Sequence, residues 1–70
     1  MNILVFKTNI RYKKDVRHIA PVLNSIPSVM LWNVDRADID KVLRIEATHN
    51  DIDAIRNSVQ YAGYFCEELI

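Results

Sequence analysis

ILVFKTNIRYKKDV, residues 3–16, is the stretch in which the spacing of apolar residues changes from a strand pattern to a helix pattern. This change indicates the fold. Its first four residues are branched or aromatic, which is typical of a strand buried on at least one face. From Asp15 onward, apolar residues recur at spacings of three and four, as on one face of a helix. These residues are Val16, Ile19, Val22, Leu23 and Ile26. The polar residues between the two patterns predict a strand-to-helix loop, where small domains often carry a binding site.

The rest of the chain continues with the same two kinds of element. Residues 29–34 and 41–47 predict two strands of a hairpin, with a change of parity near Met30 that turns Trp32 and Val34 toward the core. A helix follows from Asn50, its expected N-cap, to Gly63, and residues 64–70 predict a last strand. The order βαββαβ predicts an α+β fold, a ferredoxin-like sandwich with a four-stranded antiparallel sheet and two helices on one face.

Composition narrows the classes of function. With 70 residues the chain is expected to form a single domain, 1–70. Nine basic and nine acidic residues leave no net charge, which argues against binding to nucleic acid or an anionic membrane. The N-terminus has no signal-peptide pattern, and no apolar run approaches the roughly 20 residues of a membrane span. A lone cysteine, Cys66, suits a reducing compartment, and we expect a cytoplasmic protein.

Several stretches resemble the heavy-metal-associated domains of copper chaperones, mercury-binding proteins and metal-pumping ATPases. The stretches are FKTNI before the first helix, VMLWNVD and DKVLRIEA for the hairpin, and QYAGYFCEELI for the end of the second helix and the last strand. The resemblance spans essentially the whole chain and implies the same ferredoxin-like fold.

The family's metal site is missing from the corresponding loop. The resemblance implies two cysteines there, separated by two residues, which would bind Cu(I), Zn(II) or Hg(II). Their positions fall on Tyr12 and Asp15, which offer no pair of soft ligands. Lys13 and Lys14 between them add positive charge that opposes a bound cation. We therefore expect no metal and no cofactor at this loop.

Other residues give little support for catalysis or metal binding. No nucleophile–base set and no glycine-rich loop is recognisable, so no enzyme is expected. His18 and His49 lack a second ligand at a metal-binding spacing, and Cys66 is expected to be a small buried hydrophobe. The alternative is that a heavy-metal ion is bound or transported through unconventional ligands such as Asp15, Cys66 or Met1.

The sheet face opposite the helices is the most informative positive feature. Strand alternation turns six residues toward the helices: Leu4, Phe6, Leu43, Ile45, Tyr64 and Cys66. It places four apolar residues on the opposite face, where they are expected to form one stripe over three adjacent strands: Ile3, Val5, Val42 and Phe65. Such a stripe on a small domain favours a protein partner, and self-association into a dimer is the simplest choice. RNA-recognition modules share the βαββαβ order, but one exposed aromatic and balanced charges make an RNA-binding role less favoured.

Overall fold

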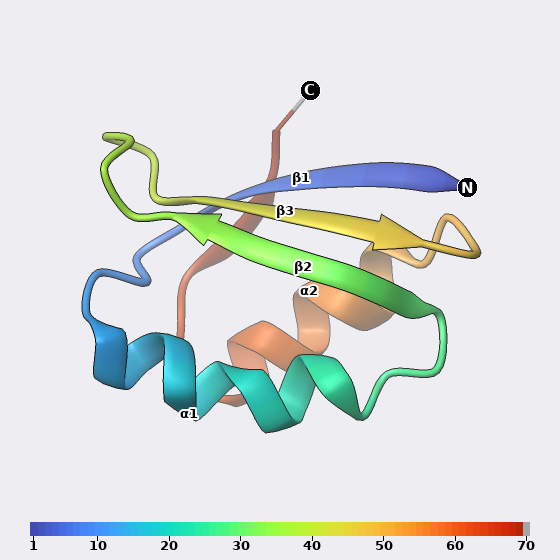
Figure 1. Ribbon diagram of the computed structural model, residues 1–70, viewed down its shortest axis with the longest axis horizontal. Helices are drawn as coiled ribbons and strands as arrows, with labels where there is room; N and C mark the ends of the chain where they lie inside the picture. The colour runs from blue at the N-terminus through green and yellow to red at the C-terminus, as the bar shows by residue number, and fades with distance from the viewer. Residues whose placement is uncertain (70) are drawn as a thin grey trace.

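The computed structural model describes residues 1–69, and their element order matches the expected one. The elements are β1 (Asn2–Thr8), α1 (Lys13–Asn24), β2 (Val29–Asp35), β3 (Val42–Ala47), α2 (Ile52–Tyr61) and β4 (Cys66–Glu68). The strands form one antiparallel sheet in the order β2-β3-β1-β4. Both helices lie on the same side of this sheet (Figure 1). The predicted ferredoxin-like sandwich is confirmed.

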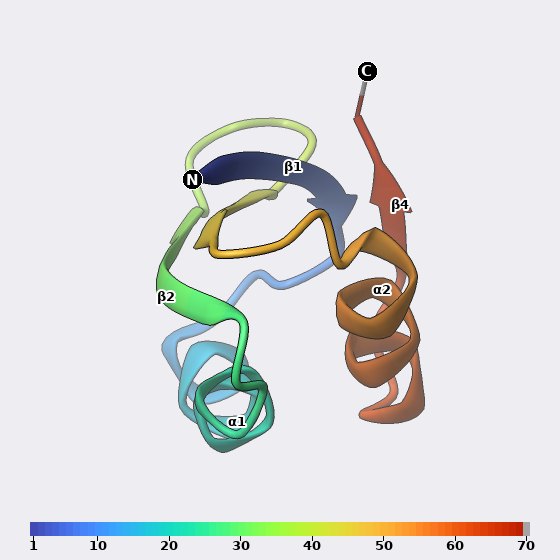
Figure 2. The same ribbon diagram turned by 90° about the vertical axis from the view of Figure 1, so that its right-hand side faces the viewer.

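The two helices lie side by side beneath different parts of the sheet. Viewed along the layers, α1 lies under β2 and α2 lies under β4 (Figure 2). Within residues 1–69, no helix covers the opposite face, which is called the open face below. None of the described helices is long and apolar enough to cross a membrane.

The core lies between the sheet and the helices and follows from strand alternation. In β1, Leu4 and Phe6 are buried, whereas the odd-numbered residues around them are partly or largely exposed. Their partners in β3 are Ile45 and Leu43, both fully buried, so the inward faces of the two central strands meet. The helices add apolar side chains with no exposed surface: Ile19, Leu23, Ile55 and Val59. Burial of these side chains is the main favourable contribution to folding.

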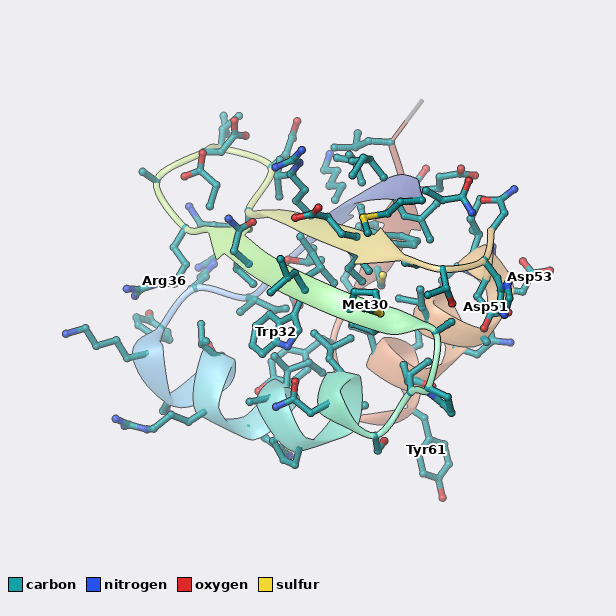
Figure 3. The ribbon with its side chains drawn as sticks, turned by 45° about the vertical axis from the view of Figure 1, so that its right-hand side comes forward. Met30, Trp32, Arg36, Asp51, Asp53 and Tyr61 are labelled. Atoms are coloured by element: carbon teal, nitrogen blue, oxygen red, sulfur yellow. The ribbon has the colours of Figure 1, made fainter. Side chains whose placement is uncertain are left out.

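Strand β2 differs from the expectation in one respect. Its register shifts between Val29 and Leu31, which confirms the predicted change of parity. Trp32 and Val34 do turn toward the helices and pack against the core, but they are only half-buried rather than buried. The reason is that β2 is an edge strand, with a neighbour on one side only. Trp32 extends from β2 toward α1 (Figure 3), and its Nε1 donates a hydrogen bond to Asn24 Oδ1 at 2.9 Å.

The two ends of α2 can also be compared with the prediction. The N-cap of α2 is Asp51 rather than Asn50, and its carboxylate accepts a hydrogen bond from Ser28 Oγ at 2.8 Å. That bond ties the start of α2 to the segment before β2. Gly63 has φ +100°, the left-handed conformation expected just after the end of a helix.

Candidate functional site

The loop between β1 and α1 is anchored at its start by a short polar network. Ile10 is fully buried, and its backbone N–H donates to Thr8 Oγ1 at 3.2 Å. The same hydroxyl donates to the carbonyl of Lys41 at 2.6 Å, which joins this loop to the start of β3. The β1–α1 and β2–β3 loops therefore lie at the same end of the molecule (Figure 1).

Asp15 closes the loop from the first turn of α1. Its Oδ2 accepts hydrogen bonds from the backbone N–H groups of Tyr12, the N-cap residue, at 3.0 Å and of Arg11 at 3.3 Å. Its Oδ1 accepts a third, from the hydroxyl of Tyr64 at 3.1 Å. The backbone bond from Tyr12 is the largest influence that lowers the pKa of the Asp15 carboxyl below its ordinary value.

The side chain of Tyr64 links the segment before β4 to the Asp15 carboxylate. Its hydroxyl also lies 3.3 Å from His18 Nδ1, and the two rings meet edge to face with their centroids 5.8 Å apart. Burial raises the pKa of the Tyr64 phenol, and the neighbouring Asp15 carboxylate raises it further. The resulting polar cluster of Asp15, His18 and Tyr64 joins α1 to the chain at the entrance of β4.

Tyr12 and Asp15, the positions that the resemblance assigns to metal ligands, hold no arrangement suited to a soft metal. Tyr12 is exposed, and Lys14 Nζ lies 5.6 Å from the centre of its ring, within the range of a cation–π contact. Both carboxylate oxygens of Asp15 already accept hydrogen bonds from the protein. A cation entering here would compete with these donors for the carboxylate and would approach the Lys14 ammonium.

The alternative metal ligands are not brought together either. Cys66 is 2% exposed and faces Thr8 across the sheet, and burial raises the pKa of its thiol to about 11. A thiol with that pKa stays protonated near neutral pH, and the thiolate is the form that binds metals. Met1 precedes β1, at the opposite end of that strand from the loop. Among residues 1–69, no three His, Cys, Asp or Glu side chains are grouped so as to hold a metal ion.

The open face carries the four residues predicted for an interface, but not as one stripe. Ile3 is 46% exposed, and Val5 and Val42 are half-buried. Phe65 is 47% exposed but precedes β4, and its backbone N–H donates to Asn9 Oδ1 at 2.9 Å. It therefore lies beyond the end of β1, away from Ile3. The expectation of one continuous stripe was wrong because β4 pairs with the last residues of β1 rather than with its start.

Another apolar residue of this face was missed. Leu31 is 63% exposed and faces Glu46, which on its other side faces Ile3. The three form a row across β2, β3 and β1. The change of parity near Met30 was a signal that could have placed Leu31 outward, because skipping one residue turns the following side chains to the other face.

The hydrogen bonds of Asp15 predict a pH-dependent contribution to stability. Since the folded state lowers its pKa below the 3.8 of a free aspartate, this contribution is complete above that value. It is lost as the pH falls through the folded-state pKa. Asp15→Asn should therefore reduce the free energy of unfolding at neutral pH, and the difference from the wild type should shrink in acid. Urea unfolding of both proteins across this range measures it.

A matched control is Asp53→Asn, in the first turn of α2. The side chain of Asp53 is 82% exposed and, within residues 1–69, accepts a bond from the Arg56 side chain rather than from the backbone, so its replacement should change stability less at neutral pH. A difference between wild type and Asp15→Asn that stays constant in acid would show that the carboxylate does not stabilise the loop through its charge.

Comparison with known proteins identifies the fold. No protein-family model matches the sequence, and the search of curated proteins finds no match. Among solved structures, the N-terminal domain of PacS from Synechocystis PCC6803 superimposes with a TM-score of 0.84 at 15% identity, covering 100% of both chains. The chain has the heavy-metal-associated, ferredoxin-like fold.

Two further structures share this heavy-metal-associated fold. The N-terminal domain of ZntA in its Zn(II) form gives a TM-score of 0.80 at 15% identity, covering 94% of this chain and 89% of the other. The yeast copper transporter domain CCC2A, determined in apo and Cu(I)-loaded states, gives 0.80 at 14% identity over 100% and 97%. Identities this low establish the common fold alone.

Proposed function

We propose that this domain is a degenerate heavy-metal-associated domain that acts as a protein-interaction module, with a second copy of itself as partner. The observation that carries the proposal is the open face. It has no covering layer within residues 1–69, and it presents Ile3, Leu31 and Phe65, each about half exposed or more. Ile3 and Leu31 lie in one row on either side of Glu46, and an exposed apolar patch bordered by charged residues is typical of a protein contact.

The β1–α1 loop supports the metal-free part of the proposal. The chain has one cysteine, and it lies in β4 rather than in the loop. Asp15 is in the position of the second family cysteine. One oxygen of its carboxylate accepts a hydrogen bond from the loop backbone, and the other accepts one from Tyr64. Metal binding through unconventional ligands is the weaker candidate, because Asp15, Cys66 and Met1 lie in three separate places.

The charges of the open face favour a second copy over an unrelated partner. Arg44 and Glu46 are neighbours on the outer side of β3, and Lys7 faces Glu67 across β1 and β4. A two-fold contact places the same patch on both sides, so a patch with both signs can pair with itself. A partner whose surface is strongly acidic or strongly basic would not be complementary in charge to this face. A cytoplasmic location, which suits the lone cysteine, is part of the proposal, as are the lack of an enzymatic role and of a cofactor.

Sedimentation equilibrium tests the dimer. The wild type should sediment as a dimer at tens of micromolar, and Ile3→Lys with Leu31→Lys should sediment as a folded monomer. The two lysines would flank Glu46 and replace both apolar members of the outer row. Tyr61→Lys is the matched control: Tyr61 is 96% exposed but projects from α2 away from the sheet (Figure 3), so the dimer should persist. A wild type that is monomeric at millimolar concentration would overturn the proposal.

A further inference from the structure

A cavity of about 430 Å³ lies where the β1–α1 and β2–β3 loops meet. Its lining residues are Thr8, Asn9, Arg11, Arg36, Ile39 and Lys41. Three of the six are basic and none is acidic, in a chain whose basic and acidic residues are equal in number. The cavity is therefore a local concentration of positive charge.

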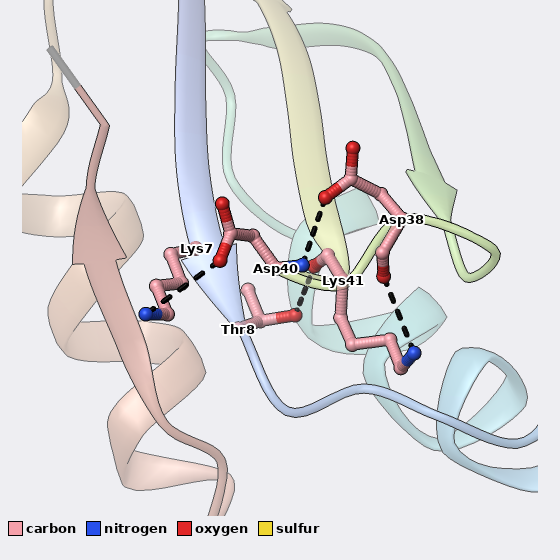
Figure 4. A network of polar contacts seen from close by, with 5 residues as sticks. All are labelled: Lys7, Thr8, Asp38, Asp40 and Lys41. Atoms are coloured by element: carbon pink, nitrogen blue, oxygen red, sulfur yellow. Dashed lines mark hydrogen bonds and ion pairs between the residues drawn. The ribbon is translucent and has the colours of Figure 1, made fainter.

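The basic residues of the cavity are held by contacts between the two loops. Arg36 Nη1 donates to the backbone carbonyl of Arg11 at 3.5 Å, which joins the end of β2 to the β1–α1 loop. Lys41 has φ +47°, a left-handed conformation that is uncommon for a residue with a side chain. Its carbonyl accepts the bond from Thr8 Oγ1, and its ammonium donates to the carbonyl of Asp38 at 3.2 Å (Figure 4).

The aspartates at the end of β2 and in the β2–β3 loop keep their charge, but their carboxylates contact other groups rather than the residues that line the cavity. Asp35 Oδ1 accepts hydrogen bonds from the backbone N–H groups of Ala37 and Asp38. Asp38 Oδ1 accepts one from the N–H of Asp40 at 2.8 Å, and the Asp40 carboxylate lies 3.6 Å from Lys7 Nζ (Figure 4). None of these aspartates lines the cavity.

A second hollow next to the first extends the positive region. It has a volume of about 470 Å³ between α1 and β2, and it is lined by Lys13, Arg17 and Arg36 together with four uncharged residues. Arg36 lines both hollows, at the end of β2 (Figure 3). Concentrated charge of one sign in a concave surface raises the local concentration of oppositely charged ligands.

We propose that the cavity between the two loops binds the phosphate group of a small phosphate monoester. Two arginines and a lysine supply the charged donors that phosphate oxygens accept, and guanidinium groups match a phosphate with paired hydrogen bonds. Ile39 borders the same cavity and is 92% exposed, so an apolar or planar body attached to the phosphate has a surface to cover. Ile3 and Leu31, the two residues changed in the dimer test, do not line this cavity, so binding there does not depend on dimer formation.

The test is an NMR titration of the ¹⁵N-labelled protein at constant ionic strength. The probes are inorganic phosphate, adenosine monophosphate and adenosine. Adenosine monophosphate should give saturable shifts at Arg11, Arg36, Ile39 and Lys41. Phosphate should shift the basic residues with several-fold weaker affinity, and adenosine should give no saturable shift. This comparison separates a monoester from free phosphate as the ligand.

Two variants and a control connect the binding to the cavity. Arg36→Gln should weaken binding of adenosine monophosphate about tenfold or more, since it removes a charge-assisted contact. Lys41→Gly removes the ammonium and suits the left-handed backbone, so it should lose affinity by a similar factor without a lower melting temperature. Arg56→Gln, on α2 beside Asp53, should bind as the wild type does.

Four results would overturn the proposal. The first is the absence of saturable shifts at the cavity, and the second is equal loss of affinity in Arg56→Gln and Arg36→Gln. Equal affinities for phosphate and adenosine monophosphate would contradict the monoester assignment. Single-stranded RNA binding at the same residues, with no response to adenosine monophosphate, would make the region a nucleic-acid surface instead and would likewise overturn it.

Discussion

Phe6→Ala should leave most of the protein unfolded at room temperature. Phe6 has no exposed surface, and its strand β1 lies in the middle of the sheet, pairing with both β3 and β4. Truncating a buried phenylalanine typically costs about 3–5 kcal/mol, because apolar contacts are lost and a cavity is left. A domain of this size has only about 3–5 kcal/mol from its core, so the loss is comparable to its whole stability. Thermal unfolding followed by circular dichroism measures the effect.

Phe65→Ala is the matched control for this substitution. The same side chain is removed, but Phe65 is 47% exposed and lies outside the core cluster. Measured on dilute monomer, its effect should be within about 0.5–1 kcal/mol, as for most surface positions. If Phe6→Ala melted like the wild type, or if Phe65→Ala were the more damaging change, the assignment of the sheet's inner and outer faces would be wrong.

Tyr12→Cys combined with Asp15→Cys should create a tight site for Cu(I) or Zn(II). The wild type has no thiol in the loop, whereas the variant has two at a spacing of two intervening residues, next to the N-terminus of α1. A helix N-terminus lowers the pKa of a nearby thiol, and thiolates prefer soft metals. Affinity should rise by several orders of magnitude, measured by competition with a chromophoric chelator.

The serine pair Tyr12→Ser and Asp15→Ser is the control for this gain. It removes the same side chains, including the bonds from Asp15 to Tyr12 and Tyr64, but supplies no soft ligand. Both variants should melt lower than the wild type without metal, and only the cysteine pair should melt higher once metal is added. A cysteine pair that binds no more tightly than the serine pair would mean that this loop no longer has the backbone of a metal site.

The core and the order of elements could be predicted because both depend on local pattern. The alternation of Leu4 and Phe6 in β1, and of Leu43 and Ile45 in β3, identified the inward faces without reference to the partner strands. The half-burial of Trp32 could not be predicted in this way, since it depends on the edge position of β2. Edge or centre is a property of the whole sheet rather than of one strand.

The positions of Phe65 and of the loop cluster depend on contacts distant in sequence. Parity correctly turned Phe65 away from the core, but its position along the sheet depends on how β4 pairs with β1. Similarly, the pattern turned Tyr64 inward without indicating Asp15 as its partner, 49 residues away. The hydrogen-bonded loop could therefore not be predicted from the sequence alone, although the sequence does show that the loop contains no cysteine.

We propose that this protein, although it has the heavy-metal-associated fold, functions without a soft metal ion. Competition of the wild-type protein with a chromophoric chelator for Cu(I), and separately for Zn(II), tests it most directly. We predict that the chelator keeps the metal in both cases, because Tyr12 and Asp15 provide no thiolate and the Cys66 thiol is buried with a raised pKa. One equivalent of either metal held by the wild type with sub-micromolar affinity would contradict the claim.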